Sequence, residues 1–82
     1  MYLHIGQNTV IENRTVVGIF DLDAVTVTEN ARKFLSDAEK NGQVEYVSLY
    51  DLPKSFIVCI EDGKQKIYIS PLNAQTLTKR VI

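Results

Sequence analysis

The sequence predicts an α+β fold: a small, curved and mainly antiparallel sheet with two helices, one central and one C-terminal. Two regions rich in β-branched and aromatic residues, 2–22 and 44–70, favour strands. Between them, apolar residues recur at intervals of three and four, which is typical of an amphipathic helix. A serine-proline pair followed by further apolar and then basic residues predicts a second helix at the end. The 82 residues have room for one core, so we expect a single domain over residues 1–82.

The first half of the chain contains three predicted strands. Residues 2–5 alternate between apolar and polar and stop at a glycine, and residues 9–11 resume extended structure after a turn. A polar break follows, and then the sequence TVVGIFDL over residues 15–22 forms the strongest predicted strand. Gly18 inside this strand indicates a bulge or a close neighbour.

Residues 28–40 are predicted to form the central helix. Two residues are candidates for its N-cap: Thr26, which has the capping-box spacing to Glu29, and Thr28. Gly42 follows the helix and supplies a left-handed C-terminal cap. The apolar stripe consists of Ala31, Phe34, Leu35 and Ala38.

The second half returns to strands. Residues 44–49 form a weak strand, and a turn over residues 50–53 leads into a near-continuous apolar run over residues 55–61, as expected for a strand covered on both faces. Asp62-Gly63 is a typical hairpin dipeptide, with a loop that either ends there or extends to residue 65, and residues 66–70 form the partner strand.

A closing helix is predicted after the last strand. The Ser70 hydroxyl is the expected N-cap and Pro71 the expected first helical residue. Leu72, Leu77 and Val81 are its apolar anchors.

Composition excludes several classes of function. Nine basic and ten acidic residues leave a net charge of −1, so any basic surface must be local. A single cysteine, Cys59, rules out an internal disulfide and favours a reducing compartment.

No signal peptide and no apolar stretch long enough to span a membrane is seen, so we expect a cytoplasmic protein without a membrane partner. Phosphate loops, metal-ligand clusters and nucleophile elbows are absent, which predicts no enzyme activity, no cofactor and no metal. A small-ligand site near His4 or Cys59 is a minor alternative.

The basic residues carry the functional hypothesis. Six of the nine are Arg14 in the polar break, Arg32-Lys33 on the central helix, Lys54 before the apolar strand, and Lys79-Arg80 near the end. Taken singly, each is an ordinary solubilising charge. Phosphate binding grows with the number of neutralised charges, at a salt slope of about −0.9 per contact, so several must converge in the fold or across an oligomer.

Two segments, MYLHIGQNTVIENRTVVGIFDLD at the start and YISPLNAQTLTKR near the end, resemble the RemB type of extracellular matrix regulatory proteins. These are small cytoplasmic proteins of Gram-positive, often spore-forming, bacteria. The resemblance covers nearly the whole chain. Its most specific parts are VVGIFDLD, PKSFIV and SPLNAQTLTKR, none of which is a catalytic motif.

The RemB type is similar to the RemA type, and this relation implies DNA-binding regulators of biofilm matrix genes that assemble as rings of identical subunits. Asn13-Arg14 matches an Asn-Arg pair of RemA-type members, and Lys54 matches a basic residue before the long apolar strand, so the resemblance implies Arg14 and Lys54 as DNA-binding residues. Where RemA-type members carry an arginine pair, this sequence has Leu52-Pro53, which removes two phosphate or guanine contacts per subunit.

Two hypotheses follow. The leading one is a self-assembling transcriptional regulator, a ring-shaped homo-oligomer that contacts DNA phosphates through Arg14 and Lys54. The alternative is an oligomerisation or protein-interaction module that does not bind DNA and acts with a related regulator, with apolar residues such as Phe20, Tyr46, Phe56 and Tyr68 at interfaces or in the core.

Overall fold

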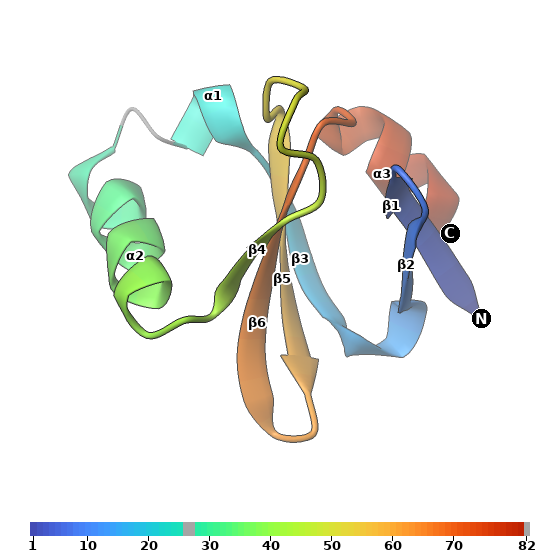
Figure 1. Cartoon of the computed structure of the whole chain (residues 1–82), viewed down its shortest axis with the longest axis horizontal. Coiled ribbons are helices and arrows are strands. Elements are labelled where there is room, and N and C mark those ends of the chain that lie inside the picture. Colours follow the sequence, from blue (N-terminus) through green and yellow to red (C-terminus); the bar gives the residue numbers. More distant parts are fainter. Residues whose placement is uncertain (26–27, 82) are drawn as a thin grey trace.

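The computed structural model describes residues 1–25 and 28–81. Figure 1 shows the arrangement of the elements. In chain order they are β1 (Tyr2–Gly6), β2 (Thr9–Glu12), a 3-10 turn η1 (Asn13–Thr15), β3 (Val16–Asp21), α1 (Leu22–Val25), α2 (Glu29–Lys40), β4 (Val44–Tyr46), β5 (Ser55–Glu61), β6 (Lys64–Ser70) and α3 (Ala74–Val81).

The strands form two sheets. The main sheet has the order β3-β5-β6-β4, with antiparallel pairs except for β4, which runs parallel to β6. The strands β1 and β2 form a separate antiparallel hairpin. The predicted α+β class, with a mainly antiparallel sheet, a central helix and a C-terminal helix, is confirmed. The separate hairpin and the short helix α1 were not anticipated.

The main sheet lies between two layers. The helix α2 lies against one face, and the β1–β2 hairpin and α3 cover the other (Figure 1). The strand β5 supplies side chains to both layers, because alternate residues of a strand point to opposite faces. Ile57 and Cys59 pack in the cluster with Leu3, Ile5 and Leu77. Phe56 and Val58 pack in a second cluster with α2, together with Ala38, Ile67 and Ile69. The prediction that this strand is covered on both faces is therefore confirmed.

Local signals set the ends of α2. The Thr28 hydroxyl is the N-cap and accepts a hydrogen bond from the Ala31 N–H at 3.2 Å. Gly42 has the left-handed φ of +70° expected after a helix. The other candidate cap, Thr26, lies outside the described residues.

The predicted cap of the closing helix is wrong. The helix α3 begins at Ala74, and Asn73 Oδ1 caps it by accepting a hydrogen bond from the Thr76 N–H at 2.8 Å. The buried Ser70 hydroxyl instead donates to the Ile5 carbonyl oxygen at 2.6 Å and accepts from the Leu72 N–H at 3.1 Å. Ser70 thus joins the main sheet to the β1–β2 hairpin.

Two turns reflect special backbone conformations. Asp62 and Gly63, with φ of 52° and 77°, form the two-residue turn between β5 and β6. The longer loop to residue 65 is therefore not formed. Gly18 sits at a register shift in β3, and a Cβ at Gly18 would come within 2.7 Å of the Phe20 ring. Both predicted reasons for this glycine, a bulge and a close neighbour, are present.

Within residues 1–25 and 28–81, none of the helices has the length and apolar character needed to cross a membrane.

Candidate nucleic-acid interface

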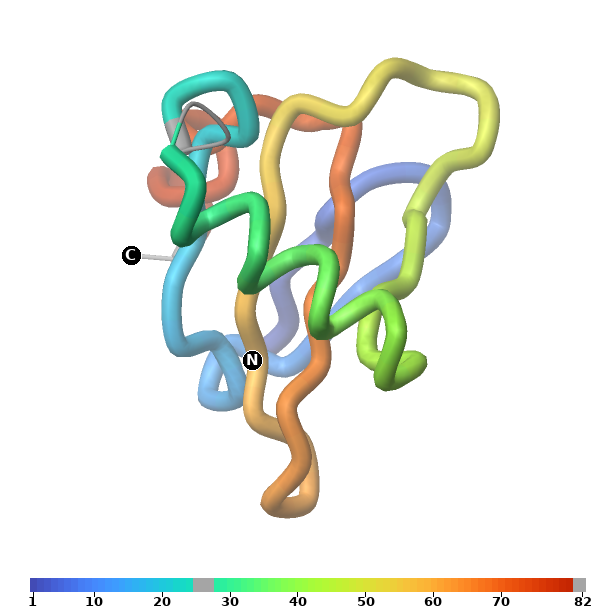
Figure 2. The backbone as a smooth tube through the Cα atoms, turned by 90° about the vertical axis from the view of Figure 1, so that its left-hand side faces the viewer, coloured from blue at the N-terminus to red at the C-terminus, as the bar shows by residue number. Residues whose placement is uncertain are grey.

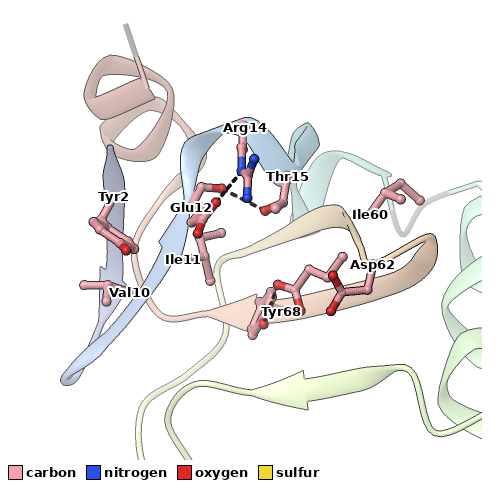
Figure 3. Close-up of a pocket in the computed structure, with 10 residues that line it drawn as sticks. Tyr2, Val10, Ile11, Glu12, Arg14, Thr15, Ile60, Asp62 and Tyr68 are labelled. Carbon is pink, nitrogen blue, oxygen red and sulfur yellow. Dashed lines mark hydrogen bonds and ion pairs between the residues drawn. The ribbon is translucent and has the colours of Figure 1, made fainter.

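Arg14 lies in the turn η1 between β2 and β3. Its neighbours hold the turn: the Asn13 N–H donates to the Met1 carbonyl oxygen at 3.1 Å, and the Thr15 hydroxyl donates to the Glu12 carbonyl oxygen at 2.8 Å. The Arg14 side chain is 84% exposed, and its Nε donates to the Glu12 carboxylate (Figure 3). The guanidinium is therefore accessible, while its charge is partly offset by its neighbour.

The surroundings of Arg14 are acidic. Arg14 lines a shallow hollow of about 490 Å³ between the β1–β2 hairpin and the end of β5 (Figure 3). The same hollow contains the carboxylates of Glu12, Glu61 and Asp62. One of them, Glu61, accepts a hydrogen bond from the Tyr68 hydroxyl at 2.9 Å. The three carboxylates that share this hollow with Arg14 disfavour a phosphate group there, so Arg14 by itself is a weak anion site.

Lys54 lies directly before β5, at the end of the long loop after β4. Its backbone is fixed on both sides: the Lys54 N–H donates to the Ser70 carbonyl oxygen at 2.9 Å, and its own carbonyl oxygen accepts from the Leu22 N–H at 3.0 Å. The side chain is exposed. Among residues 1–25 and 28–81, the ion pairs are Arg14–Glu12 and Lys66–Glu45, so none involves Lys54.

The fold separates the two predicted DNA-binding residues. Because β3 and β5 are antiparallel, the start of β3 at Val16 pairs with Cys59, and its end at Asp21 pairs with Ser55. Arg14 is therefore beside one end of β5, and Lys54 is at the other. The four residue steps between Ser55 and Cys59 span about 13 Å. The two cationic residues of one chain therefore lie apart along β5 and do not form one cluster of charge.

Two other cationic residues, Arg80 and Lys66, make contacts within the chain. Arg80 Nη1 donates to the His4 carbonyl oxygen at 3.0 Å. Lys66 Nζ is 3.1 Å from the Glu45 carboxylate, and this contact raises the pKa of Lys66. The same ammonium lies 5.1 Å from the centroid of the Tyr68 ring. Arg80 and Lys66 are therefore less available to a phosphate group than Lys54.

The alternative hypothesis of a small-ligand site near His4 or Cys59 receives little support from the surroundings of these two residues. Cys59 is fully buried, and burial raises the pKa of its thiol, whereas a reactive cysteine needs a lowered one. The His4 ring Nε2 lies 2.8 Å from the Gln7 carbonyl oxygen, in the turn of the β1–β2 hairpin. Both residues therefore serve the packing and the turn in this structure.

The fold and these positions define a small α+β domain with an exposed cationic side chain near each end of the strand β5. The family model of RemA-like proteins, described as extracellular matrix regulatory protein A-like, matches residues 2–81. A similar protein is extracellular matrix regulatory protein B of Bacillus subtilis strain 168, which is 38% identical over 80 residues, covering 98% of this chain and 89% of that protein. The chain belongs to the RemA-like family of extracellular matrix regulatory proteins. Family and relative are regulatory proteins by name, not enzymes.

One feature of the surface was missed at the sequence level. The turn predicted at residues 50–53 is part of a loop whose apolar side chains point to solvent, with Leu49 and Tyr50 83% and 96% exposed. The available signal was the occurrence of leucine and tyrosine within a turn, beside Asp51 and Pro53. Such residues are usually placed in a core, and only the fold shows that they are outside it.

Proposed function

We propose that this chain is a self-assembling transcriptional regulator of extracellular matrix genes that contacts DNA phosphates through Arg14 and Lys54, repeated around a homo-oligomer. The family and the 38% identical relative support a role in matrix regulation. The observation that carries the phosphate contact is that both cationic side chains are exposed on backbone held by hydrogen bonds. Fixed backbone lowers the entropy lost when such a side chain binds.

Assembly is a necessary part of the proposal. A subunit with a net charge of −1 has little overall attraction for a polyanion. Two cations at opposite ends of β5 contribute at most two phosphate contacts. Because each contact adds to the dependence of binding on salt, repetition of the pair around an oligomer multiplies affinity for a long duplex.

The pairing of Arg14 with Glu12 is compatible with DNA contact. Exposed ion pairs are worth about 0–1 kcal/mol, so a phosphate can displace Glu12 at little cost. The acidic hollow around Arg14 makes this contact weaker than that of Lys54. We therefore expect Lys54 to contribute more than Arg14 to the free energy of binding.

The test is a fluorescence-anisotropy titration of duplex DNA at low salt with the wild type, Arg14→Gln, Lys54→Gln and the control Lys40→Gln at the end of α2. We expect both site variants to bind several-fold more weakly and to have a shallower salt slope, and the control to match the wild type. Equal weakening by all three variants, or no binding by the wild type, contradicts the proposed contact.

A second candidate function is an oligomerisation module without DNA contact that acts with a related regulator. The acidic side chains around Arg14 and the uncharged Leu52-Pro53 favour it. In that case, the wild type forms an oligomer but shows no DNA binding at any salt concentration. Light scattering and the anisotropy titration together distinguish the two candidates.

A further inference from the structure

The loop between β4 and β5 presents an unusual group of apolar side chains to solvent. Leu49, Tyr50 and Leu52 are 83%, 96% and 83% exposed. Single exposed apolar residues are common on protein surfaces, but three in one loop form a patch that favours a partner. Figure 2 shows this loop projecting beyond the strands. We call residues 49–52 the apolar loop.

The apolar loop has a defined shape. The Ser48 hydroxyl accepts hydrogen bonds from the backbone N–H groups of Tyr50 and Asp51 at 3.3 and 3.2 Å, and it donates to the Asp51 carboxylate at 3.1 Å. The Gln7 side-chain amide donates to the same carboxylate at 3.2 Å, which ties the loop to the β1–β2 turn. A loop already ordered loses little conformational entropy when it binds.

An apolar groove lies between the start of α2 and the edge strand β3. Its volume is about 510 Å³. Its apolar lining consists of Val17, Phe20, Ala31, Phe34, Phe56 and Val58. Phe20 stacks on Phe56 with ring centroids 5.0 Å apart, and this stack is possible because Gly18 leaves room for the Phe20 ring. Val17 is 67% exposed, so apolar surface of the groove is open to solvent.

The apolar loop and the groove are at opposite edges of the sheet. The groove belongs to β3, the first strand in the order β3-β5-β6-β4, and the loop follows β4, the last strand. In Figure 2 the start of α2 lies over the β3 side, and the loop projects on the β4 side. The two surfaces of one subunit therefore point in different directions. Such a pair suits a head-to-tail contact, which generates rings when the rotation closes.

We propose that the apolar loop of one subunit packs into the groove of the next copy of this chain. The inference rests on the self-assembly in the proposed function and names the surfaces that perform it. Specific interfaces bury about 800 Å² per partner. A buried tyrosine contributes about 150–250 Å² and each leucine somewhat less, so the apolar loop supplies roughly half of that area. The exposed polar residues beside the loop and groove supply the rest, as in the rim of ordinary interfaces.

A head-to-tail assembly of this kind also repeats Lys54 at regular intervals around the oligomer. Lys54 is two residues after Leu52, at the base of the apolar loop. Each head-to-tail contact therefore carries one exposed lysine near its rim. An assembly built in this way repeats that charge once per subunit, as the proposed phosphate contact requires.

The test uses two defective variants and their mixture. The loop variant carries Tyr50→Ser and Leu52→Ser, and the groove variant carries Val17→Glu. In sedimentation velocity at tens of micromolar, we expect the wild type to be an oligomer and each variant to be a monomer of 9.3 kDa. An equimolar mixture still has one intact loop and one intact groove, so it forms a heterodimer of twice that mass. Monomers alone in the mixture contradict the pairing of loop with groove.

Matched controls separate assembly from folding. Tyr2→Ser and Val10→Glu make the same kinds of change at exposed positions beside the other hollow, and we expect them to keep the oligomer. Circular dichroism establishes that each variant is folded, and Phe34→Gln serves as the groove variant should Val17→Glu not fold. A monomeric wild type overturns the inference and the self-assembly together. An oligomeric wild type whose loop variant is equally oligomeric overturns the inference alone.

Discussion

The two faces of the main sheet are covered to different extents. On one face, the β1–β2 hairpin and α3 bury Leu3, Ile5, Ile57 and Leu77 almost completely. On the other, α2 is a single helix of 12 residues, about 18 Å long, which crosses the sheet obliquely (Figure 2). It leaves Phe20 and Phe34 40% and 37% exposed. The chain therefore covers one face of the sheet almost fully, which we call the completed face, and leaves apolar surface exposed on the other, which we call the open face.

The largest expected effect compares one leucine on each face. Leu77 of α3 is fully buried, whereas Leu35 of α2 is only partly buried. We expect Leu77→Ala to lower the free energy of unfolding by about 2–5 kcal/mol, because it removes buried methyl groups and leaves a cavity. Leu35→Ala should cost clearly less, since its site is partly open to solvent. Urea denaturation measures both, and an equal or larger loss for Leu35→Ala would contradict the comparison.

The second effect is a loss of stability at alkaline pH, caused by Tyr68 on the completed face of the sheet. Burial and the hydrogen bond to Glu61 raise the pKa of Tyr68 to about 12, compared with about 10 in an unfolded chain. Folding therefore favours the protonated hydroxyl. This stability is fully present below pH 10 and is lost as the pH rises from about 10 to 12.

The shift of Tyr68 corresponds to at most about 2–3 kcal/mol. We expect the free energy of unfolding to fall over this pH range in the wild type and to fall less in Tyr68→Phe. Urea unfolding at several pH values measures the slopes. Identical slopes of the free energy of unfolding against pH for the two proteins would show that Tyr68 does not cause the loss of stability.

The third effect tests the link between the main sheet and the hairpin. Ser70→Ala leaves the Ile5 carbonyl oxygen without its partner in a buried position, which costs about 1–3 kcal/mol. The matched control is Ser36→Ala on the exposed side of α2, which we expect to change stability by less than about 0.5 kcal/mol. Denaturation of both variants checks the prediction, and equal losses would show that the buried link is unimportant.

The smallest effect is on the helix of the open face. Thr28→Ala removes the side-chain cap of α2 and should cost about 1 kcal/mol. Hydrogen exchange should then be faster in α2 while the protection of β5 and β6 changes less, because these strands keep the core of the completed face. Uniformly faster exchange across the chain would mean that the two faces unfold as one unit.

Signals confined to a few neighbouring residues allowed much of the fold to be predicted. The apolar run of β5 gave its bounds and its coverage on two faces. The stripe of α2, its cap at Thr28 and the left-handed Gly42 gave the central helix. These features depend on hydrophobic periodicity and capping chemistry, which are readable without tertiary structure.

The features that were missed depend on contacts distant in sequence. Ser70 fits the pattern of a helix cap, but its hydroxyl binds Ile5, 65 residues away. The separation of Arg14 from Lys54 follows from the antiparallel pairing of β3 with β5, which the sequence pattern does not specify. The exposure of Leu49, Tyr50 and Leu52 likewise follows from the position of their loop, because apolar character alone predicts burial.

The central claim is that a nearly neutral subunit binds DNA only when assembly gathers its cations. The most direct measurement is the slope of the logarithm of the DNA-binding constant against the logarithm of the salt concentration. One subunit with two phosphate contacts gives a slope no steeper than about −1.8, whereas four subunits bound together give about −7. We expect a slope well beyond the single-subunit limit for the wild type and a return to that limit, or no binding, for the monomeric loop variant. A monomeric variant that binds as tightly and with as steep a slope as the wild type would contradict it.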